Sequence, residues 1–271
     1  MFYNAKNGEL QLDRTSMEYI RFGTGTKQLV FLPGLGDGLR SVKGTALFMA
    51  LLYRKYASEY SVYMFSRKKR IDTGSTTRDM AKDLKNAMTM LGIEKADIIG
   101  VSMGGMIAQH FAADYPQFVD KLVLVVTAAQ PNPILNDSVN EWIDLAKAGD
   151  HPGLMESNLR HIYSEDYYKK NRWLIPVTGI LTKPHSYERF FRQAEACLTH
   201  NALSALSNIS ASTLIIGGEK DLALGAEASR ELHAHIRNSL LHIYSNGYHG
   251  LYEEEKGFNE LVLRFLKTNT I

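Results

Sequence analysis

Residues 96–115 restrict the fold of this chain more than any other stretch, because a short apolar run there meets a serine set between glycines. The run Ala96–Val101 predicts a buried strand, and the pattern over 103–115 predicts a helix. The two are joined as Gly100-Val101-Ser102-Met103-Gly104. Glycine tolerates the close backbone approach and positive φ of a very tight strand-to-helix turn. We therefore predict that Ser102 stands clear of a sheet at a helix N-terminus.

The rest of the chain alternates between apolar runs and helical patterns. Continuous apolar runs are typical of strands buried on both faces, and their alternation with helices is typical of a parallel sheet covered on both sides. We therefore predict an α/β fold whose mostly parallel central sheet has helices on both faces and opens with an antiparallel hairpin. The predicted strands are 9–12, 17–22, 28–32, 61–65, 96–101, 121–126, 213–217 and 239–244, and the predicted helices are 43–56, 76–91, 103–115, 223–236 and 253–266.

The alternation is interrupted after Thr127. From residue 131 to residue 206 we find helical patterns and no apolar strand, and the strand pattern resumes beyond it. We predict that residues 1–130 and 207–271 form one α/β core domain and that residues 131–206 form a helical cap inserted into it.

Composition excludes several classes of protein. Lys and Arg total 31 against 29 Asp and Glu, a net charge of +2 that favours neither nucleic acid nor an anionic membrane as a partner. The single cysteine, Cys197, has no partner for an internal disulfide, and we find neither a signal-peptide pattern nor an apolar run long enough to span a bilayer. We expect a cytoplasmic monomer or homodimer that acts on a small molecule.

A serine hydroxyl becomes a nucleophile only when a base takes its proton and an acid orients that base. Asp221 and Glu219 both follow the predicted strand 213–217, and His249 follows the strand 239–244 in a loop between two glycines. The order of serine, acid and histidine suits such a site. A serine in a glycine turn can also serve only as a helix cap, and Glu219 competes with Asp221 for the role of the acid. We favour Ser102 as nucleophile and Asp221 as acid.

With these motifs the chain resembles an α/β-hydrolase over essentially its full length. The resemblance makes residues 100–105 the nucleophile elbow, Asp221 the orienting acid and His249 the general base. It also implies an oxyanion hole made by the backbone N–H groups of Met103 and Leu35. Many relatives have histidine where this chain has Pro33. Because the donors are backbone groups, we expect the hole to persist without that side chain.

The resemblance also suggests a reaction. Family members that are dehalogenases or epoxide hydrolases use an aspartate nucleophile, whereas position 102 is a serine. We expect an acyl-enzyme on Ser102 during hydrolysis of a small or medium carboxylic ester, thioester or lactone, with no cofactor. The alternatives are carbon–carbon bond hydrolysis, lyase or perhydrolase chemistry with the same triad, and a slow-turnover ligand-binding receptor.

Further side chains are candidates for substrate contact. The small residues Gly34 and Gly36 leave room for a ligand in the loop after residue 32, and the aromatic residues Tyr163, Tyr167 and Trp173 of the cap could line an acyl pocket or simply pack. The basic run 67–70 could attract an anionic substrate or form a solvated turn. No pair of histidines has metal-ligand spacing with a third ligand in view, so we predict no metal site.

Overall fold

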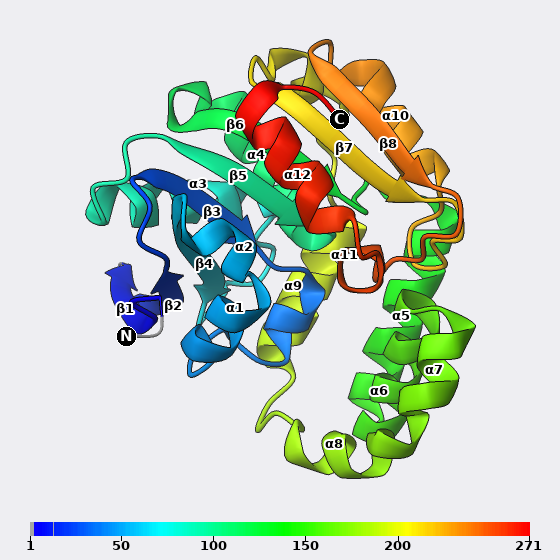
Figure 1. Cartoon of the computed structure of the whole chain (residues 1–271). Helices are drawn as coiled ribbons and strands as arrows, with labels where there is room; N and C mark the ends of the chain where they lie inside the picture. Colours follow the sequence, from blue (N-terminus) through cyan, green and yellow to red (C-terminus); the bar gives the residue numbers. More distant parts are fainter. Residues whose placement is uncertain (1–2, 13) are drawn as a thin grey trace.

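The central sheet organises the computed structural model, which describes residues 3–12 and 14–271, the side chains of residues 178, 180 and 181 excepted (Figure 1). Within the described residues the strand order is β1-β2-β4-β3-β5-β6-β7-β8. The β1–β2 and β2–β4 pairs are antiparallel and all the others are parallel. The strands are β1 (Lys6–Leu12), β2 (Thr15–Phe22), β3 (Lys27–Leu32), β4 (Tyr60–Lys68), β5 (Ala96–Val101), β6 (Val119–Val125), β7 (Ser212–Gly218) and β8 (Ser239–Tyr244).

This architecture confirms the predicted fold class and the predicted opening hairpin. Asp13, in the predicted hairpin turn, lies outside the described residues. All six residues of β5 are buried, including the polar Asp97 within the predicted apolar run. Successive side chains of a strand point to opposite faces, so Ile98 packs in the core on one face and Ile99 in the core on the other.

Helices cover both faces of the sheet. The core on one face includes side chains of α3 (Thr77–Met90), α4 (Met103–Asp114) and α10 (Glu227–His235). The core on the other face includes those of α1 (Ala46–Leu52), α2 (Arg54–Ala57), α11 (Leu251–Glu254) and α12 (Phe258–Thr268). The predicted start of α3 is confirmed, since Thr76 and Asp79 form a reciprocal capping box.

Three predicted helices differ from those observed. The predicted helix 43–56 is two short helices separated at Tyr53, and the predicted helix 253–266 is divided into α11 and α12. The predicted helix 223–236 begins only at Glu227. Gly225, whose φ of 77° is left-handed, separates the turn at residues 221–224 from the helix. The loop after β3 contains a short 3-10 helix, η1 (Leu35–Gly38), that we did not predict.

The elements between β6 and β7 are helices joined by loops, and the described residues there form no strand. We call residues 133–208 the helical segment. In Figure 1 its first helices form a lobe beside the sheet, and α9 returns to the core. The boundaries that we predict for a cap domain stay a prediction. None of the described helices has the length and apolarity needed to cross a bilayer. The helices are α5 (Pro133–Lys147), α6 (His151–Ile162), α7 (Glu165–Asn171), η3 (Arg172–Leu174), α8 (Ile175–Leu181), α9 (Glu188–Leu198) and η4 (Leu203–Asn208).

Candidate active site

Ser102 lies on a strained turn between β5 and α4. Its φ of 54° and ψ of −122° fall outside the regions that residues with a Cβ prefer. Neighbouring groups hold the turn on both sides. The Ser102 N–H donates to the carbonyl of Val125 over 2.9 Å, and the Ser102 carbonyl accepts from Gly105 N–H at 2.8 Å and from Thr127 Oγ1 at 2.7 Å. The surrounding structure therefore fixes a conformation that aims one hydroxyl out of the sheet.

The glycines of this turn are required by close backbone contacts. A Cβ atom on Gly104 would lie 2.0 Å from the carbonyl oxygen of Leu32. A Cβ atom on Gly100 would lie 2.6 Å from the carbonyl oxygen of Gly104. Real Cβ atoms do not approach backbone atoms so closely, so only glycine lets α4 start directly above the end of β3.

Three side chains distant in the sequence meet at the carboxyl ends of the strands. His249 Nε2 lies 3.0 Å from Ser102 Oγ, and His249 Nδ1 lies 2.8 Å from Asp221 Oδ2. His249 is 5% exposed and Asp221 6%. The arrangement suits a neutral imidazole that donates from Nδ1 to Asp221 and accepts the Ser102 hydroxyl proton at Nε2. The structure thus brings together the serine, acid and histidine that the sequence proposes.

Asp221 is oriented by its own turn. Its Oδ1 accepts hydrogen bonds from the N–H groups of Ala223 and Leu224, both at 2.9 Å, which leaves Oδ2 to face His249. The competing acid Glu219 instead pairs with Arg230, its Oε2 lying 2.7 Å from Nη2, and its side chain is 48% exposed. The geometry therefore favours Asp221 over Glu219 as the partner of the histidine.

The loop of residues 33–38 passes directly beside Ser102. A Cβ atom on Gly34 would lie 3.3 Å from the Cβ of Ser102. Among the described residues, no acceptor is found for the backbone N–H groups of Leu35 and Met103. Free N–H groups beside a serine hydroxyl are what an oxyanion hole needs.

A cavity of about 320 Å³ opens between this loop and the helical segment. Tyr163 connects it to the histidine loop, because Gly250 N–H donates to the carbonyl of Ile162 at 2.6 Å and the ring of Tyr163 packs against Gly250. Most of the lining could not be predicted from the sequence, although residues 151, 155, 159 and 162 have the spacing of one face of a helix, and they line the cavity from α6. The lining residues are Gly36, Leu39, Arg40, His151, Met155, Asn158, Leu159, Ile162, Tyr163 and Thr182.

The remaining residues predicted to contact the substrate lie in different places in the structure. Gly36 and Tyr163 line the cavity, and the Tyr163 hydroxyl donates to Glu253 at 2.8 Å. Tyr167 stacks on Tyr163 with 4.2 Å between ring centroids. Trp173 is 70% exposed, so the structure does not bring it to the others.

The basic run 67–70 does not act as one unit. Arg67 is buried near the end of β4, whereas the exposed Lys69 pairs with Glu9 at the surface and with the buried carboxylate of Glu18. The strand continues to Lys68, so the run is divided between the sheet and the following turn.

Two buried histidines, His110 of α4 and His200 after α9, pack against each other outside the triad. The Nδ1 of His200 is 2.8 Å from the hydroxyl of Thr77, and its ring packs edge-on against that of His110. Burial lowers the pKa of His200 to about 3 and also lowers the pKa of His110. Both rings are therefore neutral at physiological pH, consistent with structural roles.

Comparisons with known proteins extend over the whole chain. A family model described as alpha/beta hydrolase fold matches residues 28–163. A 2-hydroxy-6-oxononadienedioate/2-hydroxy-6-oxononatrienedioate hydrolase of Pseudomonas putida is 29% identical over 98% of this chain and 96% of its own. The enzyme of that name from Klebsiella pneumoniae is 28% identical over 90% and 88% of the two chains.

Solved structures give the same architecture. The α/β hydrolase enzyme MGS-M2 from a deep-sea metagenome library of the Medee basin has a TM-score of 0.84 and 25% identity over 97% of this chain and 98% of its own. An enol-lactonase of Burkholderia xenovorans has a TM-score of 0.80 over 96% and 100% of the two chains, and its 18% identity marks a likeness of fold.

Proposed function

Since the chain belongs to the α/β-hydrolase family, we propose that it hydrolyses an acyl bond with Ser102 as nucleophile. The observation that carries this proposal is the continuous chain of contacts from Ser102 Oγ through His249 to Asp221, at 3.0 and 2.8 Å. A buried carboxylate fixes the tautomer of the imidazole and stabilises its cation.

The proposed reaction proceeds in two halves. His249 takes the proton of Ser102 as its oxygen attacks the substrate carbonyl, and the N–H groups of Leu35 and Met103 bind the resulting oxyanion. The leaving group departs with the proton from His249, so that an acyl-enzyme remains. Water, deprotonated by His249, then attacks the acyl carbon, and the carboxylic acid leaves as Ser102 regains its proton.

For the bond that is broken, we propose a carbon–carbon bond beside a ketone in an unsaturated oxo acid. The support comes from the two curated relatives, which are named as hydrolases of 2-hydroxy-6-oxononadienedioate. Carbon is a poor leaving group unless its electron pair is delocalised. In the dienol form the electron pair released at C5 would be vinylic and not delocalised, so a proton must first shift from the 2-hydroxyl group to C5. The ketone formed at C2 then takes up the electron pair when Ser102 attacks the C6 ketone and the C5–C6 bond breaks, and His249 returns a proton to the leaving dienolate.

Hydrolysis of a small or medium carboxylic ester, thioester or lactone, the main expectation from the sequence, is the second candidate. It is favoured by the cavity next to the 33–38 loop, whose lining includes the apolar side chains of Leu39, Met155, Leu159 and Ile162. An ester needs no such electron delocalisation, because its alkoxide leaves readily when it is protonated by the histidine.

A paired substrate assay tests both candidates. Wild type and Ser102→Ala are compared on 2-hydroxy-6-oxonona-2,4-dienedioate, followed by loss of its conjugated absorbance, and on p-nitrophenyl acetate and butyrate. Ser245→Ala, an exposed serine in the loop before His249, is the control. We expect turnover that Ser102→Ala abolishes and Ser245→Ala retains. Equal rates for wild type and Ser102→Ala on every substrate that turns over would refute the proposal. The ratio of the wild-type kcat/KM values for the dienedioate and for the esters decides between the two candidates.

A further inference from the structure

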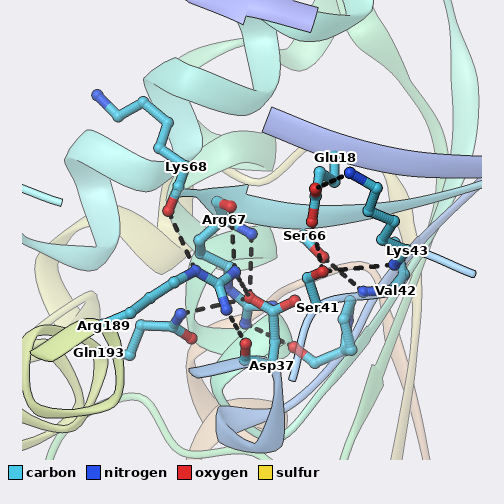
Figure 2. A network of polar contacts seen from close by, with 11 residues as sticks. Glu18, Asp37, Ser41, Val42, Lys43, Ser66, Arg67, Lys68, Arg189 and Gln193 are labelled. Atoms are coloured by element: carbon cyan, nitrogen blue, oxygen red, sulfur yellow. Dashed lines mark hydrogen bonds and ion pairs between the residues drawn. The ribbon is translucent and has the colours of Figure 1, made fainter. Parts of the chain in front are cut away.

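A buried ionic cluster lies beneath the 33–38 loop, outside the triad. Figure 2 shows Asp37 of the loop facing Arg67 of β4 and two side chains of α9, Arg189 and Gln193. The side chains of Asp37 and Arg67 are 1% and 5% exposed. The cluster therefore joins the loop, the sheet and the helical segment in a place that water hardly reaches.

The carboxylate of Asp37 is the centre of this cluster. Its Oδ2 accepts from the Arg67 backbone N–H at 3.0 Å, from Gln193 Nε2 at 3.3 Å and from Arg189 Nη2. The Arg67 guanidinium lies 3.8 Å away. Arg189 also donates to the carbonyls of Arg67 and Lys68, at 3.1 and 3.2 Å. The guanidinium group of Arg189 on α9 therefore binds both the loop and the end of β4.

The two arginines hold backbone carbonyls on both sides of Leu35. Arg67 Nη2 donates to the carbonyl of Pro33 at 2.5 Å, and Arg189 Nη1 donates to the carbonyl of Asp37. Since residues 33 and 37 bracket the Leu35 peptide, these two bonds restrict where its N–H can point. The direction of that N–H decides how well it meets a developing oxyanion.

The backbone of helix α9 also contacts the backbone of the loop directly. A Cβ atom on Gly38 would lie 2.8 Å from the Cα of Phe190. The helix backbone is therefore seated on the end of η1, one residue from Arg189.

Such a cluster is a costly way to stabilise a protein. Burying charges removes them from water, and an apolar replacement of equal volume is often as stable or more so. The pKa of Arg67 is lowered by burial, and four of the buried polar atoms of the cluster have no hydrogen-bond partner among the described residues: Asp37 Oδ1, Arg67 Nε, Arg67 Nη1 and Gln193 Oε1. The cost of burying these charges therefore favours a role in fixing geometry over a gain in stability.

We propose that Arg189 and Asp37 are positioning residues that couple helix α9 to the oxyanion hole by fixing the Leu35 N–H. This inference rests on the proposed acyl hydrolysis at Ser102. It assigns to the helical segment a part in transition-state binding, in addition to any contact with substrate.

The test compares Arg189→Met with Arg192→Met, which removes the same charge from the same helix. Arg192 pairs only with Glu188 and Glu195 among the described side chains and does not reach Asp37. We expect Arg189→Met to lower kcat by about 10- to 100-fold, part of the cost of losing one oxyanion donor. KM should stay within about threefold, because the donor acts on the transition state. Arg192→Met should match wild type in both.

Two further readouts separate positioning from simple loss of structure. Phenylboronic acid forms a tetrahedral adduct with a reactive serine, so its inhibition constant should weaken with kcat in Arg189→Met. Arg189→Lys, which keeps the charge, should recover part of the loss. If Arg189→Met does not fold, Arg189→Lys and Asp37→Asn replace it in the same comparison. A loss that appears in KM alone, or equally in Arg192→Met, would overturn the proposal.

Hydrogen exchange keeps this inference independent of the choice of substrate. The amides of residues 33–39 should exchange about tenfold faster in Arg189→Met than in wild type or Arg192→Met. If no substrate turns over with wild type, the proposed function fails, and exchange still decides whether Arg189 fixes the loop. Unchanged exchange in Arg189→Met overturns the inference whatever the activity.

Discussion

Replacing Asp221 by asparagine should reverse the direction of the hydrogen bond between residue 221 and His249 while leaving the shape of the triad intact. In the wild type, Oδ1 accepts from the N–H groups of Ala223 and Leu224, and Oδ2 faces His249. An asparagine keeps its single oxygen on the two backbone donors, because turning the amide over would set its NH₂ group against both N–H groups. Losing those two hydrogen bonds would cost about 2–6 kcal/mol, since each unmet buried donor costs about 1–3 kcal/mol.

The amide NH₂ must then donate to Nδ1 of His249. The imidazole is forced to carry its proton on Nε2, where it cannot accept a proton from the Ser102 hydroxyl. We expect kcat to fall by about 10⁴, which corresponds to about 5.4 kcal/mol of transition-state stabilisation. Thermal unfolding should change little, because the replacement has the same shape.

The assay is steady-state turnover by Asp221→Asn on the best substrate of the wild type, with Glu219→Gln as the control. Glu219→Gln should keep nearly full activity, since this side chain pairs with Arg230 at the surface. A fall of less than tenfold in Asp221→Asn, or an equal fall in Glu219→Gln, would refute the assignment of the acid.

Three further predictions concern stability. Gly104→Ala should lower the free energy of unfolding, measured with denaturant, by about 3 kcal/mol, because its Cβ would lie 2.0 Å from the last carbonyl of β3. The control Gly36→Ala has open space around its Cβ and should change the free energy of unfolding by no more than about 0.5 kcal/mol. The pKa of His200 is lowered from 6.5 to about 3 by burial, so its unfolded state binds more protons below neutral pH. Between pH 8 and pH 5 this residue alone should remove about 2 kcal/mol of stability, a loss that His200→Gln reduces and the exposed-site control His235→Gln does not. Burial raises the pKa of Asp97 from 3.8 to about 6, so Asp97→Asn should increase the free energy of unfolding at pH 8 by up to about 3 kcal/mol and lose that gain near pH 4.

The fold could be predicted because its signals are local. The apolar run of the central strand β5 is buried on both faces, and both β5 and the half-buried edge strand β8 begin and end at the predicted residues. The capping box of Thr76 and Asp79 spans only three residues, and it forms as predicted. Helix ends were less predictable where the backbone conformation of one residue decides them. The start of α10 is one such case, because the left-handed φ of Gly225 separates the Asp221 turn from the helix.

The geometry of the candidate site was also accessible from the sequence, for a topological reason. In a parallel sheet, the loops after successive strands meet at one edge, so an acid after β7 and a histidine after β8 must approach a serine after β5. The cavity lining was not accessible, since it depends on how α6 lies against the 33–38 loop, and no spacing along the chain encodes that distance.

The contacts that support the 33–38 loop could not be predicted from the sequence. Pro33 has no polar side chain with which to hold the loop, and the basic run 67–70 gives no sign of replacing one. In the structure β4 extends through Lys68. This extension places the side chain of Arg67 inside the protein, where it donates to the carbonyl of Pro33. The second hold comes from Arg189, 152 positions from Asp37 in the chain. Neither contact follows from the pattern of residues near the loop. Only the three-dimensional arrangement shows that two arginine side chains hold the loop on both sides of Leu35, although Pro33 replaces the histidine of many relatives.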